Sequence, residues 1–274
     1  MTSIKKAYAD TPLGQVHYRY AAPPPGTPTK DALVLLHMSA SSGASMEALM
    51  GILVPAGHPC YAPDMPGFGS SFDPTSDPPN IGWYVELYAD HVFPAMGLQP
   101  GRFHLIGHHS GGVIGLDMAV SHPQLLKSLV SIGPAVMTAE QRSEMRTKYV
   151  VPFNQAEPSG AHLLKTWEYL SDQAHNIPTT ELSLLQREAI DHIRAWRGRL
   201  QIYGCVWSQD SERLLEEVKT PTLALCARDD VLWAYFDSFK ALRPDIKSAE
   251  IDGGNFGPDR GTKSIAAQVT AWLQ

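Results

Sequence analysis

Short, strand-like apolar runs alternate with helical patterns along the first half of the chain. A pair of short alternating segments, which predicts an antiparallel hairpin, is followed by four such runs at 32–37, 59–63, 103–107 and 129–132. Between these runs, apolar residues recur every three or four positions, which is typical of helices. Continuously apolar strands separated by helices indicate right-handed crossovers and a mostly parallel sheet with helices on both faces.

The alternation stops in the middle of the sequence. Between 135 and 207 no strand-like run appears, and the longest of several helical patterns covers 181–203. The strand-like runs then resume after position 219. We therefore predict an α/β fold whose core consists of 1–134 and 208–274, interrupted by a helical cap at 135–207.

Composition and charge exclude several kinds of partner. The 274 residues include 22 Lys and Arg against 28 Asp and Glu, a net charge of −6, with no block of like charges. No nucleic-acid partner is expected, because a phosphate backbone binds concentrated positive charge. No stretch approaches the roughly 18 apolar residues of a membrane span, and the first residues lack the apolar segment of a leader peptide. Three widely spaced cysteines suit a reducing compartment, so we predict a cytoplasmic protein that does not bind membranes.

The candidate chemistry centres on a glycine-rich turn within 103–112. We expect Ser110 to lie at a strained turn between a strand and a helix, with its hydroxyl lifted clear of the sheet. Ser110 is then the predicted nucleophile, and the N–H of Gly111 is one predicted oxyanion donor. The strict G-x-S-x-G spacing around this serine fails, because position 108 is His. The alternative is that Ser110 only caps the next helix.

Two other loops follow predicted strands. Met38 or Ser39, just after the run at 32–37, is expected to supply the second oxyanion donor. We interpret the neighbouring His37 as a side chain hydrogen-bonded beneath this loop. We interpret Asp64 as structural, accepting N–H groups in a Gly- and Pro-containing turn.

Together these pieces resemble the α/β-hydrolase fold over essentially the whole chain. One matching piece is the glycine-rich turn at Ser110, which we call the elbow, and another is the cap. The other matching segments are Leu36-His37, Asp64-Met65-Pro66-Gly67-Phe68-Gly69-Ser70 and Cys226-Ala227-Arg228-Asp229-Asp230. The resemblance implies a triad in the chain order serine, acid, histidine, in which Asp229 matches the acid and Asp230 is the adjacent alternative. A serine nucleophile also disfavours the haloalkane dehalogenases and epoxide hydrolases of this fold, which use an aspartate there.

The family's histidine is missing from its usual place. It follows the last strand in a Gly-Gly-His-Phe-like turn, where this chain has Asn255, and no histidine occurs after His192. An amide cannot take the proton of a serine as an imidazole does. Three explanations stay open: an engineered His-to-Asn variant, a natural enzyme in which His109 or His162 is the base, and a ligand-binding pseudo-hydrolase or lyase on the same scaffold.

The substrate pocket is expected between the cap and the loops at the carboxyl ends of the strands. Its candidate wall residues are His37, Met38, Met137, Tyr149, Phe153, Trp167, Trp196, Trp207, Trp233 and Phe256. This aromatic and Met-rich set predicts a small, mainly apolar substrate, and the sequence shows no charged clamp. No metal and no cofactor are expected, because metal-ligand spacing and nucleotide-binding glycine motifs are both absent.

The resulting prediction is a serine hydrolase that cleaves a small ester, thioester or lactone. A carbon–carbon bond next to a ketone is an alternative target that motifs do not separate from esters. The sequence leaves the oligomeric state open, with a homodimer as one option.

Overall fold

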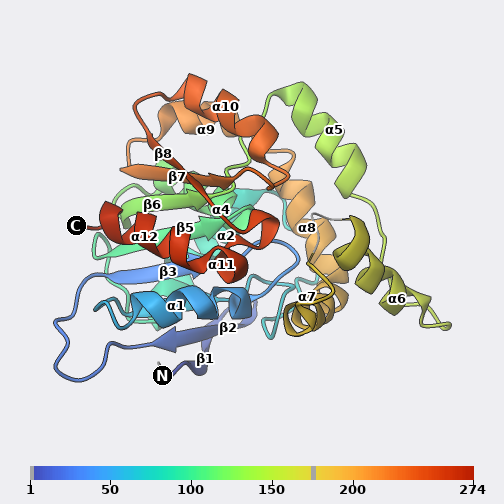
Figure 1. Ribbon diagram of the computed structural model, residues 1–274, viewed down its shortest axis with the longest axis horizontal. Coiled ribbons are helices and arrows are strands. Elements are labelled where there is room, and N and C mark those ends of the chain that lie inside the picture. Colours follow the sequence, from blue (N-terminus) through green and yellow to red (C-terminus); the bar gives the residue numbers. More distant parts are fainter. Residues whose placement is uncertain (1–2, 174–176) are drawn as a thin grey trace.

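The computed structural model describes residues 3–173 and 177–274 and contains an eight-stranded sheet (Figure 1). In chain order the strands are β1 (Lys5–Thr11), β2 (Gly14–Ala21), β3 (Ala32–Leu36), β4 (Cys60–Pro63), β5 (Phe103–His108), β6 (Leu126–Ile132), β7 (Thr222–Ala227) and β8 (Lys247–Ile251). Their spatial order is β1-β2-β4-β3-β5-β6-β7-β8. The pairs β1–β2 and β2–β4 are antiparallel, and every later pair is parallel. The predicted hairpin and mostly parallel sheet are confirmed.

Helices cover both faces of the sheet. One face carries η1 (Gly43–Met46), α1 (Glu47–Leu53), α11 (Gly257–Arg260) and α12 (Thr262–Trp272). The opposite face carries α2 (Ile81–Leu87), η2 (Tyr88–Val92), α3 (Phe93–Ala95), α4 (Ser110–Ser121), α9 (Ser211–Glu217) and α10 (Trp233–Leu242). A short turn of helix, η4 (Gly254–Phe256), connects β8 to α11. Both faces of the central strands are therefore buried, as their unbroken apolar sequences predict.

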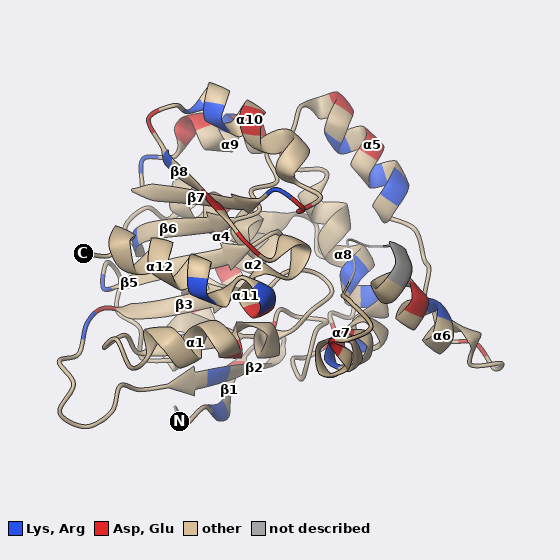
Figure 2. Ribbon diagram, viewed as in Figure 1, with Lys and Arg blue, Asp and Glu red and all other residues tan. Residues whose placement is uncertain are grey.

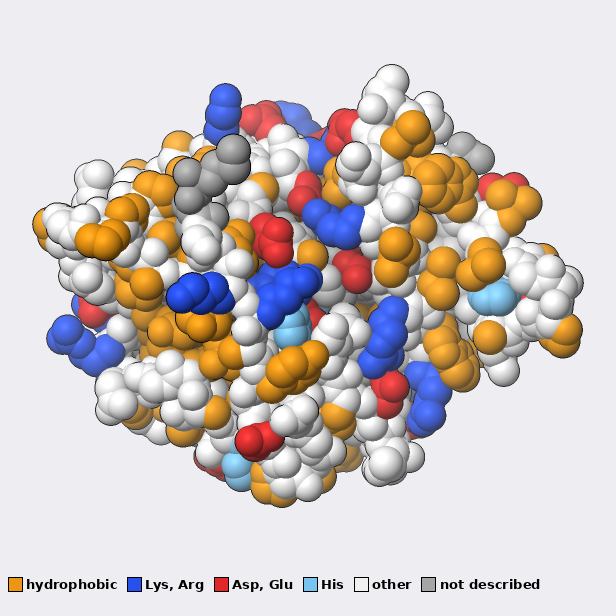
Figure 3. Space-filling model, turned by 90° about the horizontal axis from the view of Figure 1, so that it is seen from below, with side chains coloured by type: hydrophobic (Ala, Val, Ile, Leu, Met, Phe, Trp, Pro, Cys, Tyr) orange, Lys and Arg blue, Asp and Glu red, His pale blue; other side chains and the backbone are white. Residues whose placement is uncertain are grey.

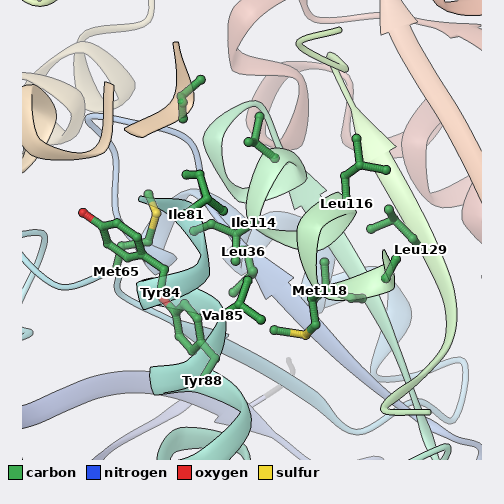
Figure 4. Close-up of a cluster of buried hydrophobic side chains, with 14 of the residues drawn as sticks. Leu36, Met65, Ile81, Tyr84, Val85, Tyr88, Ile114, Leu116, Met118 and Leu129 are labelled. Atoms are coloured by element: carbon green, nitrogen blue, oxygen red, sulfur yellow. The ribbon is translucent and has the colours of Figure 1, made fainter. Parts of the chain in front are cut away.

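The core lies in two layers, one on each side of the sheet. Leu33 and Leu35 of β3 point into the layer under α1 and α12, whereas Val34 and Leu36 point toward α2 and α4. This division follows from the period of two in a strand. Figure 4 shows part of the second layer, where side chains from α2 and α4 meet those of the sheet.

A helical insertion separates β6 from β7. It comprises α5 (Ala139–Tyr149), α6 (Ala161–Glu168), η3 (Tyr169–Gln173), α7 (Leu182–Arg194) and α8 (Trp196–Val206), and we call it the insertion below. In Figure 1 it lies on the right, beyond the carboxyl ends of the parallel strands. Its position matches the segment in which the sequence shows no strand-like run.

The single long helix expected at 181–203 is wrong, because the chain breaks at Ala195 into α7 and α8. Contacts with the core explain the break. Arg194 donates to the carbonyls of Gly69 and Ser71, and a Cβ placed on Gly198 would lie 2.5 Å from the carbonyl oxygen of Gly67. The turn after β4 therefore fixes both sides of the break, which a helical periodicity cannot reveal.

The surface carries charges of both signs. On the face seen in Figure 3, basic, acidic and hydrophobic side chains are interspersed. Cys60, Cys205 and Cys226 are buried free thiols. Within residues 3–173 and 177–274, every helix is too short or too polar to span a bilayer.

Candidate active site

The strained residue of the elbow is His109. It joins β5 to α4 with φ 46° and ψ −110°, and it is the one non-glycine residue with positive φ in the described part of the chain. The prediction that Ser110 lies at this position is wrong by one residue, because Ser110 already begins α4. The glycine spacing agrees with His109. In Gly107-His108-His109-Ser110-Gly111 the two glycines have the spacing of the G-x-S-x-G pattern, and His109 stands where that pattern has its serine.

Close backbone packing explains why the flanking residues are glycines. A Cβ on Gly107 would lie 2.4 Å from the carbonyl oxygen of Gly111, and a Cβ on Gly111 would lie 2.4 Å from that of Leu36. The start of α4 therefore contacts the ends of β3 and β5 directly. Centring the pattern on position 109 would have satisfied both glycines from the sequence alone.

Ser110 contributes a backbone N–H to the site. As the first residue of α4 it has no partner for its N–H within the helix. Its side chain lines the cavity described below, but no hydrogen bond joins its Oγ to a histidine in the described chain. Gly111, the predicted oxyanion donor, does not line that cavity.

The buried acid of the site is Asp230. Its Oδ2 lies 2.8 Å from Nε2 of His109, and its Oδ1 accepts the N–H of Leu232 at 2.8 Å. Asp229, the predicted acid, is exposed, and the carboxylate that bonds to His109 in the described chain is that of Asp230, so the structure favours the adjacent alternative. Burial alone would raise the pKa of Asp230, but the neighbouring His109 and the Leu232 N–H hold this pKa below its usual value.

Asn255 connects two loops of the site. Its Oδ1 accepts the N–H of Val231 at 2.9 Å, and the residue lines the cavity. Because Asp230 already holds His109, the carboxylate has an imidazole partner although position 255 carries none. His109 therefore occupies the strained turn and bonds to the buried carboxylate at the same time.

His108 lies beneath the elbow. It is fully buried, neither ring nitrogen has a hydrogen-bond partner in the described chain, and its ring centroid lies 4.4 Å from that of His109. Burial, followed by the proximity of His109, lowers the pKa of His108 well below its usual value. His108 is therefore a neutral imidazole packed against the site.

His108, His109 and Asp230 are also the described residues that could hold a metal ion. Their candidate ligand atoms lie within 4.8 Å of one another. The two adjacent histidines can approach one point because His109 lies in the turn after β5 and not in the strand itself. Binding a metal through Nε2 of His109 would replace its hydrogen bond to Asp230.

A cavity of about 230 Å³ opens beside His109. Its walls come from the core loops and from the insertion, and they comprise Met38, Ser39, His109, Ser110, Ala135, Met145, Lys148, Tyr149, Tyr169, Leu170, His192, Arg199, Tyr203, Val206, Trp207, Val231, Leu232, Asn255 and Phe256. Met38, Tyr149, Trp207 and Phe256 are wall residues expected from the sequence, and Ser39 was expected as an oxyanion donor. The basic side chains Lys148 and Arg199 were not expected.

Several candidates lie outside this cavity. His37 is buried, donating from Nδ1 to the carbonyl of Met38 and accepting the N–H of Met65 at Nε2, as its structural interpretation requires. His162 accepts the N–H of Glu157 in the loop before α6. Like His37, five further predicted wall residues are absent from the lining: Met137, Phe153, Trp167, Trp196 and Trp233. Of these, Met137 is buried in the core and Trp233 packs against Phe236.

Asp64 is structural, as predicted. Its carboxylate accepts the N–H groups of Gly43 and Ser70 and bonds to Nδ1 of His17 at 2.8 Å. These contacts hold the loop after β3 against the loop after β4.

The sequence carried a signal for two wall residues that were not predicted. His192 and Arg199 lie on the helix faces that also carry the buried Ala195 and Ile202. Polar or charged residues on an otherwise apolar helix face require a partner inside the fold.

The comparisons with known proteins agree with this architecture. The model of the "Alpha/beta hydrolase family" matches residues 33–261. A protein named as a carbamate hydrolase, RutD, from Yersinia enterocolitica is 30% identical over 180 residues, which is 63% of this chain and 63% of that relative. The chain thus matches just under two thirds of that relative's length. The 2-hydroxy-6-oxo-6-phenylhexa-2,4-dienoate hydrolase of Comamonas testosteroni is 28% identical over 73% of this chain and 71% of its own.

Solved structures share the fold. A hydrolase from Pseudomonas aeruginosa PA01 superimposes with a TM-score of 0.75 at 17% identity, covering 98% of each chain. The carboxylesterase CesB from Bacillus subtilis gives a TM-score of 0.74 over 99% of this chain and 92% of its own, also at 17% identity. With the family model matched from β3 to the end of α11, the chain belongs to the alpha/beta hydrolase family.

Proposed function

We propose that this protein hydrolyses a small carbonyl compound, an ester, thioester or lactone, with the pair His109–Asp230 in place of a serine triad. The observation that carries the proposal is the 2.8 Å hydrogen bond from an imidazole at the strained elbow to a buried carboxylate. Strained backbone at such a turn is typical of a reacting group, and an imidazole held by a carboxylate is the usual general base.

His109 is the base in this proposal. With Nε2–H donating to Asp230, the lone pair resides on Nδ1. A water molecule attacks the substrate carbonyl carbon and gives its proton to Nδ1, while the carbonyl π electrons move to the oxygen. Collapse of the tetrahedral intermediate breaks the bond to the leaving group, which takes the proton back from the imidazolium. Asp230 stabilises that imidazolium through its negative charge.

Backbone N–H groups of Ser110 and Ser39 are the proposed oxyanion donors. Both residues line the cavity, and no hydrogen bond engages the N–H of Ser39 in residues 3–173 and 177–274. Tyr203 donates to the carbonyl of Ser39 at 3.3 Å and so holds this peptide in place. Two preorganised donors of this kind typically lower an acyl-transfer barrier by several kcal/mol.

The pair His109–Asp230 also bears on whether Asn255 is natural or engineered. An engineered change of one histidine to asparagine would leave a serine at the elbow, whereas this chain has His109 there. The direct contact of His109 with Asp230 supports a natural rearrangement of the site. Hydrolysis would then proceed without a serine adduct.

The test is steady-state hydrolysis of p-nitrophenyl esters, a thioester and a lactone by the wild type and by His109→Ala. We expect the substitution to lower kcat/KM by about 10²–10³. His91→Ala, which removes a histidine outside the cavity, is the matched control and is expected to change nothing. A folded wild type that turns over no substrate of the panel would contradict the proposal.

A lyase is the second candidate, favoured by the absence of a hydroxyl nucleophile from the strained elbow position. His109 would then remove a proton from a carbon next to the carbonyl, and the same N–H groups would hold the enolate oxygen. The enolate would re-form the carbonyl as a carbon–carbon double bond forms to the next carbon and that carbon's bond to the leaving group breaks, and the imidazolium would return the proton to the leaving group. Deuterium incorporation at that carbon without hydrolysis would support this candidate. Hydrolysis without exchange would exclude it.

A further inference from the structure

Arg199 is a buried cation that the insertion contributes to the cavity. It belongs to α8, is 5% exposed, and lines the cavity together with His109 and Ser39. Figure 2 shows basic residues on α8, in the part of the insertion nearest the sheet. The cavity lining contains a second cation, Lys148 on the exposed end of α5, and no carboxylate.

Two aromatic rings hold the guanidinium in place. Its Cζ lies 4.7 Å from the ring centroid of Phe153 and 5.0 Å from that of Tyr203. One N–H donates to the carbonyl of Val151 at 3.3 Å. Cation–π contacts of this kind orient an arginine without neutralising its charge.

Arg199 lacks an acidic partner within the described part of the chain. Arg187, Arg194 and Arg243 each form an ion pair with a carboxylate. In the same described residues, no carboxylate oxygen lies within 4.0 Å of the Arg199 guanidinium. A guanidinium has five N–H donors; here one bonds to the Val151 carbonyl and the Tyr169 hydroxyl is a second neutral partner, so no carboxylate meets this charge among the described residues. Buried charges in folded proteins are almost always paired, so the missing anion is expected to come from a ligand in the cavity.

Tyr203 connects this cation to the reacting end of the cavity. Its ring packs against Arg199, and its hydroxyl donates to the carbonyl of Ser39, beside the proposed oxyanion donor. The separation between a bound anion and the reacting carbonyl is therefore set by one rigid side chain. A molecule with a negative group at one end and a carbonyl at the other fits both.

We propose that Arg199 is an anion subsite and that the substrate is a small carbonyl compound bearing a carboxylate. This inference rests on the proposed function for the reacting end only. A planar guanidinium matches the two oxygens of a carboxylate, and about 230 Å³ is below the roughly 300–1,000 Å³ of pockets for drug-sized ligands. This proposal differs from the mainly apolar substrate expected from the sequence, because it adds a negative group at one end.

Calorimetric titration with two matched pairs tests the subsite without turnover: butyrate against butyramide, and benzoate against benzamide. We expect the wild type to bind each carboxylate about 10- to 100-fold more tightly than its amide. Arg199→Gln should bring this ratio to about one. Arg197→Gln is the matched control, because Arg197 is an exposed arginine of the same helix that lies outside the cavity, and it should keep the ratio.

Three further measurements accompany the titrations: a fold check, a lysine variant and phosphate binding. Thermal unfolding checks the fold of Arg199→Gln, and Arg199→Lys, which keeps the charge but loses the planar fork, is expected to retain a reduced preference. Inorganic phosphate should bind more weakly than benzoate. Equal binding of acid and amide by the wild type, loss of the preference in Arg197→Gln, or phosphate binding as tight as both carboxylates would overturn the proposal. Because ligands are not turned over, these results do not depend on whether His109 catalyses hydrolysis.

Discussion

Nε2 of His109 lies 2.8 Å from Oδ2 of Asp230, so the residue at the elbow of this hydrolase fold is bonded directly to the buried acid. In the serine enzymes that the sequence resembles, a separate histidine stands between these two positions. Here Asn255 occupies that third position and bonds to Val231 instead. The site is therefore a dyad, in which one imidazole is both oriented by the acid and exposed to the cavity.

Rebuilding the triad requires two changes. The combination of His109→Ser with Asn255→His should create a serine nucleophile with its base and acid, and raise hydrolysis of p-nitrophenyl esters by about 10² over His109→Ser alone. The double variant should also become covalently labelled by a fluorophosphonate, detected by mass spectrometry. Asn255→His alone should show no comparable gain, because it provides no serine at the elbow. A large gain from that single change would instead indicate that Ser110 is the nucleophile.

Asp64 is expected to contribute strongly to stability. Burial would raise its pKa, but hydrogen bonds from His17 and Ser70 hold the pKa below 3.8. The stabilising contribution is therefore present above pH 3.8 and is lost as the pH falls through the lowered pKa. Asp64→Asn should lower the free energy of unfolding at pH 7 by about 3–5 kcal/mol, measured by urea denaturation. A loss below about 1 kcal/mol would contradict this role.

Asp191 should have the opposite effect. Burial, followed by repulsion from Glu188, raises its pKa to about 7, while Ser42 donates to Oδ2 at 2.8 Å. A raised pKa means that stability falls as the pH rises from about 4 to about 7, because the unfolded chain loses this proton over that range while the folded protein keeps it. Asp191→Asn, whose amide oxygen still accepts from Ser42, should gain about 1–2 kcal/mol relative to the wild type between pH 5 and pH 8. Melting temperatures of the wild type and of Asp191→Asn at pH 5 and pH 8 measure this gain. A difference between the two proteins that is the same at both pH values would refute the raised pKa of Asp191.

Gly111 is predicted to be irreplaceable for steric reasons. Gly111→Ala would place a Cβ 2.4 Å from the Leu36 carbonyl oxygen and should cost about 2–3 kcal/mol. Gly51→Ala is the control, because it lies within α1 with no atom within 4 Å of the added Cβ, and should be neutral or slightly stabilising. Chemical denaturation of both variants compares them. Similar stabilities would show that the elbow tolerates a side chain.

Most of the fold follows from sequence patterns, because strands and helices of the core have strong and different periodicities. Leu33 to Leu36 alternate between two core layers within a continuously apolar strand, and such a run is specific for a buried parallel sheet. The break at Ala195 was not predictable, because it arises from contacts with a turn more than a hundred residues away.

The site was predicted to within one residue at two positions. Ser110 and Asp229 were the first choices for nucleophile and acid, whereas His109 and Asp230, which form the pair, were named only as alternatives for the base and the acid. In both cases the expected chemical type, a serine and an acid in a familiar motif, outweighed the spacing of the flanking residues. Arg199 was not found because its role depends on packing between the insertion and the core, which one sequence does not reveal.

The central claim is that His109, and not Ser110, carries the chemistry. The most direct measurement compares kcat/KM for His109→Ala and Ser110→Ala on the best ester of the panel, with both folds checked by thermal unfolding. We predict a loss of about 10²–10³ for His109→Ala and less than about tenfold for Ser110→Ala, which keeps its backbone N–H. A large loss in Ser110→Ala with little change in His109→Ala would contradict the dyad and restore the serine as the nucleophile.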